Sequence, residues 1–209
     1  MKKVFIVFAL ILLSGCIPSI NPIAKNETFE DDRVIGAWKS GNSVLSIDKK
    51  IVNRLSLYSL SYKNDNIQEC YLFSISKLSN SFYISIQPVY SSTELIKKKH
   101  SDFYDSLLYP MFSFAKINID AHELIVEVLN PEKLLNIVKE DKAAIKHEII
   151  NGDVIITDES ENIQRFIAKY SDKLFSYDKK ASEYLVFRFT KINMPKSVTS
   201  PPLTPFTNP

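Results

Sequence analysis

Apolar and polar residues alternate with a period of two over much of the chain between residues 44 and 190. Leu45 and Ile47 alternate with Val44, Ser46 and Asp48. A period of two is typical of a β-strand with one buried face, because successive side chains point to opposite sides. Such one-sided strands belong to antiparallel sheets with one covered face. The pattern therefore predicts a mainly antiparallel sheet, which could curl into a barrel or half-barrel.

Further strand-like stretches follow the same rule and are separated by turn signals. They cover residues 54–62, 69–78, 81–87, 111–119, 123–129, 145–150, 154–157 and 184–190. Asn151-Gly152-Asp153 stands between two of them and predicts a tight hairpin, because Asn-Gly accepts the positive φ of such a turn. Ser residues alternate with apolar ones on several of these strands, and we expect them on a solvent-exposed face.

Helices are predicted in two places between these strands, so the fold class is α+β. Asn130-Pro131 supplies an N-cap and a first-turn proline, and Leu134, Leu135 and Val138 follow on one helical face. A second helix is predicted over residues 160–170, with apolar residues spaced by three and four that would pack on the sheet. A third helix is predicted over residues 92–108.

The 209 residues suit a single domain with terminal extensions. We expect a removed signal peptide over residues 1–15 and a solvated tether, rich in proline and acidic residues, over 16–33. The β-rich α+β domain would occupy residues 34–193. Residues 194–209 hold five prolines and no apolar periodicity, which predicts a flexible tail.

The N-terminus has the features of an export signal. Lys2 and Lys3 precede an unbroken apolar run of ten residues, Val4 to Leu13. As a helix this run would reach about 15 Å, half of the roughly 30 Å hydrocarbon core of a bilayer. Its length and its positive flank therefore favour a secretory signal over a transmembrane helix.

Leu13-Ser14-Gly15-Cys16 follows that run and resembles the lipobox of bacterial lipoprotein precursors. The resemblance implies lipidation of the Cys16 thiol and cleavage between Gly15 and Cys16. Two or three acyl chains then anchor the protein stably in a membrane. Ile17 is not the Asp that retains such lipoproteins in the inner membrane of enterobacteria, so the outer membrane is implied. The alternative is an ordinary cleaved signal followed by a coincidental Cys.

Two weaker resemblances concern the body of the chain. The order of strands and helices from Phe112 to Phe175 is similar to that of uncharacterised Gram-negative envelope lipoproteins. Gly36-Ala37-Trp38 resembles the G-x-W motif of lipocalin-like barrels, in which the Trp closes one barrel end and stacks beneath an Arg from a late strand. Arg188 is the matching candidate, because a guanidinium gains cation–π energy over an indole. The alternative for Trp38 is a structural residue in a sheet core.

No pattern in the sequence predicts a catalytic site, a metal site or a cofactor. The three histidines, His100, His122 and His147, are not at metal-ligand spacing. Cys70 is expected to be a small buried hydrophobe without a disulfide partner once Cys16 is lipidated. The basic run over residues 97–99 is either a solvated helix face or a contact with anionic lipid.

The charge balance bears on possible partners. Without Lys2 and Lys3, Lys+Arg falls from 26 to 24 and equals Asp+Glu, which gives no electrostatic reason to expect nucleic acid. From the lipobox and the absence of a catalytic pattern, we expect a lipid-anchored cell-envelope protein that acts by binding or interaction rather than by catalysis, with an envelope protein or a small apolar ligand as its partner. Two alternatives are a lipocalin-like carrier of a small apolar ligand and a hydrolase with unrecognised Ser or Asp residues. The carrier needs an apolar cavity of roughly 300–1,000 Å³, and the hydrolase needs a perturbed acid–base pair in a cleft.

Overall fold

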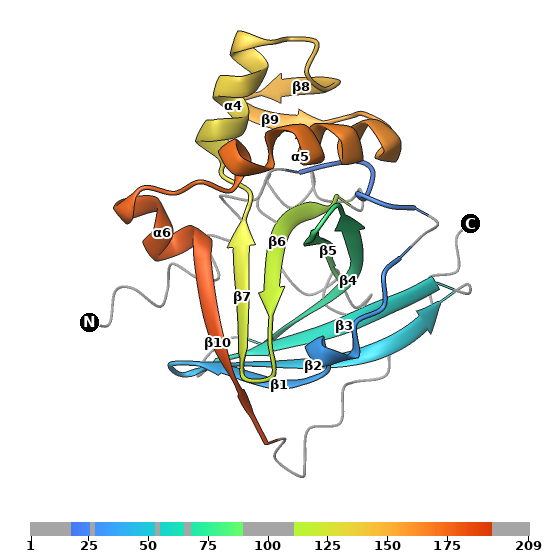
Figure 1. The fold of residues 1–209 in the computed structure, drawn as a ribbon, viewed down its shortest axis with the longest axis vertical. Helices are drawn as coiled ribbons and strands as arrows, with labels where there is room; N and C mark the ends of the chain where they lie inside the picture. Colours follow the sequence, from blue (N-terminus) through green and yellow to red (C-terminus); the bar gives the residue numbers. More distant parts are fainter. Residues whose placement is uncertain (1–17, 26–27, 53–54, 65–67, 90–110, 194–209) are drawn as a thin grey trace, which may run out of the picture.

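A computed structural model describes residues 18–25, 28–52, 55–64, 68–89 and 111–193. Eight antiparallel strands form a closed barrel in the order β1-β10-β7-β6-β5-β4-β3-β2 (Figure 1). Their bounds are β1 Gly36–Ser40, β2 Ser43–Val52, β3 Leu55–Lys63, β4 Gln68–Leu78, β5 Ser81–Pro88, β6 Ser113–Ile119, β7 Glu123–Val128 and β10 Val186–Ile192. The predicted α+β class is confirmed, and the antiparallel sheet is a complete barrel.

The alternation in the sequence explains the barrel, because each strand turns its apolar side chains inward. Leu45 pairs with Tyr62, and Phe73 pairs with Ile86, so the inward faces of neighbouring strands are continuous. The tight β1–β2 connection contains Gly41 at φ 58°, a conformation that a residue without a Cβ adopts without strain. The result is an apolar interior surrounded by eight paired strands.

A second unit packs on the outer wall of the barrel and lies at one end of the molecule in Figure 1. It consists of α4 (Pro131–Glu140), the hairpin of β8 (His147–Ile150) and β9 (Asp153–Ile156), and α5 (Ser160–Leu174). Its core includes Ile163 and Phe166 of α5 together with Tyr83 and Phe114 on β5 and β6. Tyr83 and Phe114 alternate with the inward residues of their strands, so they point away from the barrel interior.

The local predictions for this unit are confirmed. Asn130 caps α4 by accepting hydrogen bonds from the backbone N–H groups of Glu132 and Lys133 at 3.1 and 3.3 Å. Asn151 and Gly152 have φ of 54° and 93°, as the β8–β9 turn requires. A further helix, α6 (Lys179–Leu185), precedes β10 where the sequence predicted strand from residue 184. Its N-cap is Asp178, whose carboxylate accepts from the N–H of Ala181 at 2.7 Å.

The segment before β1 differs from the predicted solvated tether. Ser19 bridges Phe112 and Ile156, and both Ser19 and Ile23 have no exposed surface. Ser85 on the outer face of β5 accepts a hydrogen bond from the N–H of Ile23 at 2.9 Å. These residues fill the gap between barrel and second unit, so the packed part of the chain begins well before residue 34.

The second unit and the N-terminal segment also explain why a prediction about serines was wrong. Ser74, Ser76 and Ser85 alternate with inward apolar residues, and the sequence therefore placed them on a solvent-exposed face. They do point outward, but all three are buried. The second unit and the N-terminal segment cover part of the outer wall, which makes polar outward positions part of an interface. The predicted helix over 92–108 and the tail over 194–209 lie outside the described residues.

Candidate ligand site: an apolar hollow inside the barrel

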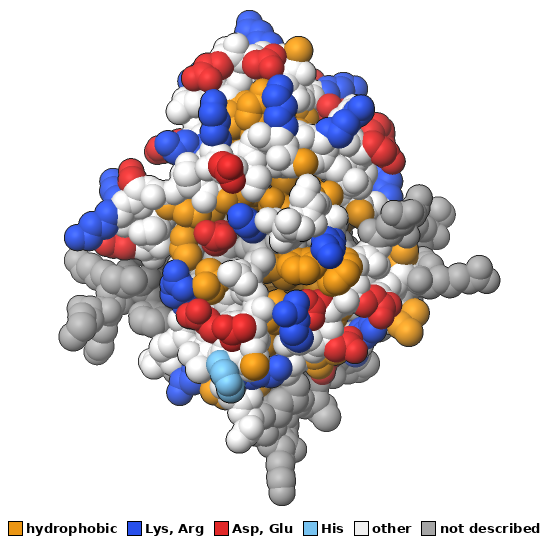
Figure 2. Space-filling view, in the orientation of Figure 1, with side chains coloured by type: hydrophobic (Ala, Val, Ile, Leu, Met, Phe, Trp, Pro, Cys, Tyr) orange, Lys and Arg blue, Asp and Glu red, His pale blue; other side chains and the backbone are white. Residues whose placement is uncertain are grey.

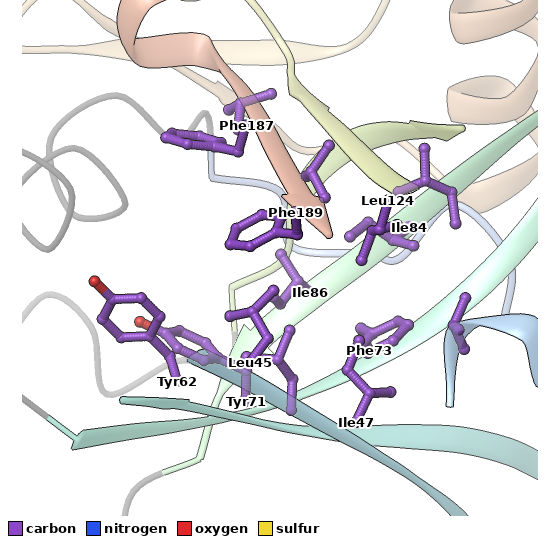
Figure 3. Close-up of a pocket in the computed structure, with 15 residues that line it drawn as sticks. Leu45, Ile47, Tyr62, Tyr71, Phe73, Ile84, Ile86, Leu124, Phe187 and Phe189 are labelled. Carbon is purple, nitrogen blue, oxygen red and sulfur yellow. The ribbon is translucent and has the colours of Figure 1, made fainter. Parts of the chain in front are cut away.

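The barrel encloses a hollow that is lined only by aliphatic and aromatic side chains (Figure 3). The cavity measures about 70 Å³ within a space of about 660 Å³ that includes volume open to solvent. The lining residues are Val34, Leu45, Ile47, Leu60, Tyr62, Tyr71, Phe73, Ile84, Ile86, Ile117, Leu124, Val126, Val128, Phe187 and Phe189. They come from seven strands and the short helix η1 (Asp32–Val34).

One end of the hollow is closed by η1 and Trp38. Val34 of η1 is buried against the lining residues, and Trp38 has no exposed surface. The Trp38 indole Nε1 donates a hydrogen bond to the Val34 carbonyl at 2.8 Å, which joins β1 to the helix. Both residues would have to move before anything could enter from this side.

A lysine covers the Trp38 ring, where the sequence predicted Arg188. Lys191 Nζ lies 4.9 Å from the centre of the indole ring and donates to the Arg33 carbonyl at 3.2 Å. Trp38 pairs with Lys191 in the β1–β10 register, whereas Arg188 is three residues earlier and therefore faces outward. Arg188 instead lies 3.6 Å from Glu123 in an exposed ion pair. The Arg188 prediction is thus wrong.

Gly36 is needed for this lysine contact. Its φ of 130° lies in the range that side chains rarely adopt, and a Cβ there would approach Lys191 Cε to 3.3 Å. The G-x-W motif therefore does place Trp38 at a barrel end. The cation above the indole is Lys191 of the final strand. It lies two residues after Phe189 and therefore on the same face of the strand. Extending the Phe187–Phe189 alternation by one step would have identified Lys191 from the sequence.

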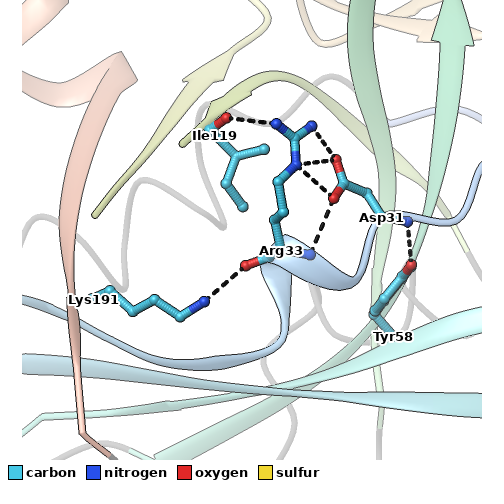
Figure 4. A network of polar contacts seen from close by, with 5 residues as sticks. All are labelled: Asp31, Arg33, Tyr58, Ile119 and Lys191. Atoms are coloured by element: carbon cyan, nitrogen blue, oxygen red, sulfur yellow. Dashed lines mark hydrogen bonds and ion pairs between the residues drawn. The ribbon is translucent and has the colours of Figure 1, made fainter. Parts of the chain in front are cut away.

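A polar network braces the outside of the closed end (Figure 4). Arg33 donates to both carboxylate oxygens of Asp31, with Nε–Oδ1 and Nη2–Oδ2 distances of 2.9 and 2.6 Å. Arg33 also donates to the carbonyl of Ile119 at 3.4 Å. The Tyr58 hydroxyl accepts from the N–H of Asp31 at 2.9 Å. The hydrogen bond from Arg33 lowers the pKa of Asp31, and burial raises the pKa of Tyr58.

The opposite end of the hollow is formed by the rings of Tyr62 and Tyr71, and no polar atom of the described residues contributes to its surface. Figure 3 shows both rings on the same side of the hollow as Phe187, away from Ile47 and Phe73. The Tyr62 hydroxyl lies 3.0 Å from Ser43 Oγ. The Tyr71 hydroxyl donates to Glu69 at 2.5 Å. Tyr71 and Phe187 are partly exposed, so the hollow meets solvent at this end.

The remaining candidate residues do not converge on the hollow. Cys70 lies on β4, half-buried rather than buried, and its strand position faces outward because Tyr71 faces inward. His122 is exposed in the β6–β7 turn. His147 is on β8 of the second unit, with Nδ1 2.8 Å from the Ile145 carbonyl. Cys16, His100 and the basic run over 97–99 lie outside the described residues.

Among the described residues, no group of three or more His, Cys, Asp or Glu side chains could hold a metal ion. None of the helices in the described ranges is long and apolar enough to cross a membrane. No family model matches the chain, and neither the curated proteins nor the solved structures contain a significant match to it.

Proposed function

We propose that this protein is a lipid-anchored cell-envelope protein whose barrel binds a slender apolar ligand, such as a single alkyl or acyl chain. The observation that carries the proposal is the hollow with its apolar lining, closed at the Trp38 end and in contact with solvent at the Tyr71 end. Of the functions expected from the sequence, the carrier is the one that requires such a hollow. Binding sites for small molecules are typically concave and mostly apolar, with a few polar groups.

The size of the hollow supports a slender ligand. The cavity of about 70 Å³ is smaller than the roughly 300–1,000 Å³ expected of a carrier, and less than half of the roughly 150 Å³ apolar cavity that accommodates benzene in an engineered protein. A single hydrocarbon chain needs less width than a ring, and further chain length can extend toward the solvent-exposed end.

The anchor is supported by the lipobox alone. Leu13-Ser14-Gly15-Cys16 would direct lipidation of Cys16, and Ile17 favours the outer membrane. In cells, Cys16→Ser should move the protein from the membrane fraction to the soluble fraction, while Ser14→Ala should leave it membrane-bound. Ile17→Asp should shift it to the inner-membrane fraction in a density gradient. A Cys16→Ser protein that resists high-salt washing of the membranes would contradict the anchor.

Ligand binding can be tested with a fluorescent apolar probe. The chain with Cys16→Ser is mixed with cis-parinaric acid, a linear polyene fatty acid whose emission rises in apolar surroundings, and dodecanoic acid is then added as a competitor. Ile86→Trp should abolish both probe binding and competition, because Ile86 points into the middle of the hollow (Figure 3). Ile51→Trp is the matched control, since Ile51 is 76% exposed. Equal probe binding by both variants would contradict binding inside the barrel.

A further inference from the structure

The packed structure begins very close to the proposed lipidation site. Ser19 and Phe112 exchange two backbone hydrogen bonds of 2.8 Å. On the other side, Ile156 donates to the Pro18 carbonyl at 2.9 Å and accepts from Ile20 at 3.0 Å. Ser19 is three residues after Cys16, and three residues span at most about 10 Å. A lipid on Cys16 would therefore hold the membrane surface within a short distance of Ser19.

The direction of the chain shows which part of the protein lies nearest the lipid. The bridge between Ser19 and Ile156 is parallel, so residues 18–20 run in the same direction as β9. Following the chain back from Ser19 therefore leads from Ile156 toward Asp153, at the turn of the β8–β9 hairpin. The first described residues, 18 and 19, thus come from the side of the second unit on which the hairpin turns, and Cys16 is two residues before Pro18.

That side carries exposed isoleucines. Ile149 and Ile150 are 50% and 53% exposed beside the turn of the β8–β9 hairpin, and we call these two residues the isoleucine surface. Ile150 pairs with Asp153 and Ile149 pairs with Val154, so the two side chains leave opposite faces of the hairpin immediately before its turn. Ile20, which is 54% exposed, follows Ser19 and lies toward the opposite end of β9 from the turn. Figure 2 shows hydrophobic side chains among the charged ones on this end of the molecule.

We propose that the isoleucine surface inserts into the interfacial region of the bilayer to which Cys16 is anchored. This inference rests on the lipid anchor of the proposed function. We name the bilayer as the partner of this surface because Ser19 is only three residues after the lipidated Cys16. Apolar side chains on membrane-bound proteins typically enter about 5–10 Å into the boundary between headgroups and acyl chains.

The contact is apolar rather than electrostatic. The exposed charged residues of the hairpin region are Lys146, Glu148 and Asp153, which together give no net positive charge. Anionic lipid would therefore gain nothing from them. Insertion should occur in neutral phosphatidylcholine vesicles, and it should be unaffected by 1 M salt, at which the Debye length is only about 3 Å.

The test uses the lipidated protein in phosphatidylcholine vesicles that contain brominated acyl chains, which quench tryptophan only at short range. Ile150→Trp should lose about half or more of its added fluorescence in these vesicles, since the residue would enter the boundary region. Ile51→Trp is the control, because Ile51 is equally a solvent-exposed isoleucine but lies on the barrel. Trp38, the single native tryptophan, is buried and gives the background signal.

The outcomes separate the two proposals. Intact mass is measured first, and a protein without acyl groups on Cys16 would overturn the anchor and this inference together. An acylated protein whose Ile150→Trp variant is quenched no more than Ile51→Trp would overturn only the inference. Ile149→Trp provides a second reporter on the same surface and should be quenched as well. Quenching that disappears in 1 M salt would also contradict an apolar contact.

Discussion

Replacement of Tyr58 by Phe tests how the closed end of the barrel is held. Tyr58 has no exposed surface, and its hydroxyl accepts the hydrogen bond from the N–H of Asp31 at 2.9 Å. The substitution keeps the ring and its stacking on Phe73, where the ring centres are 5.1 Å apart. It removes the hydroxyl alone. Asp31 is 8% exposed, so its N–H would lose its acceptor in a place that water hardly reaches.

A buried donor left without a partner costs about 1–3 kcal/mol of folding free energy. For a chain of this size, 1 kcal/mol shifts the melting temperature by about 2–4 °C, so we expect a decrease of about 2–12 °C. Burial raises the pKa of Tyr58, so the hydroxyl stays protonated at neutral pH and the cost should be constant between pH 6 and pH 9. The barrel itself should remain closed.

Urea unfolding of the Cys16→Ser chain, followed by circular dichroism, measures this cost with an unchanged m-value. Tyr83→Phe is the matched control. The Tyr83 hydroxyl lies 2.8 Å from Ser171 Oγ, and a hydroxyl partner can rotate toward another group, so we expect a loss of only about 0.5–1.5 kcal/mol. A Tyr58→Phe protein that loses less free energy than Tyr83→Phe would refute the argument.

Two further predictions concern polar contacts. Because the hydrogen bond from Arg33 lowers the pKa of Asp31, the stabilisation is complete above the ordinary Asp pKa of 3.8 and is lost as pH falls through the lower folded-state value. Asp31→Asn should therefore be less stable than the unmodified chain at pH 6, and the difference in urea midpoint should shrink below pH 4; a constant difference would contradict this role. Asn130→Ala should lose about 1–2 kcal/mol of unfolding free energy in the same assay, because the N-cap of α4 is removed. Asn130→Asp keeps the capping oxygen and should lose less; equal losses would show that the donation to the Ser176 carbonyl matters more.

The sequence was sufficient for features that depend on neighbouring residues. Asn151-Gly152 determined the β8–β9 turn, and Asn130-Pro131 determined the start of α4, because capping and turn conformations are local. The period-two alternation likewise predicted most strands. Closure of the barrel was not determined in this way. It depends on the pairing of Trp38 with Lys191, two residues far apart in the sequence.

The wrong predictions concern two things that local sequence does not show: the register of paired strands, and the segments that cover the outer wall of the barrel. Choosing Lys191 over Arg188 required extending the inward alternation of Phe187 and Phe189 by one step, a register that the pairing of β10 with β1 shows directly. The burial of Ser85 and the packing of Ile23 depend on each other, because one supplies the hydrogen-bond acceptor for the other. Pro18 and Pro22 interrupt periodicity in the N-terminal segment, so no repeating pattern indicated that it packs.

The pairing of the first barrel strand with the last also constrains the order of folding. β1 ends at Ser40 and β10 begins at Val186, so the barrel cannot close until nearly the whole described chain is present. Contacts of such long sequence separation slow folding, because the loop-closure entropy is lost before the pairing is gained. Until then β1 and β7 each expose an unpaired edge. A protein exported from its N-terminus would pass through this open-edged state during every translocation.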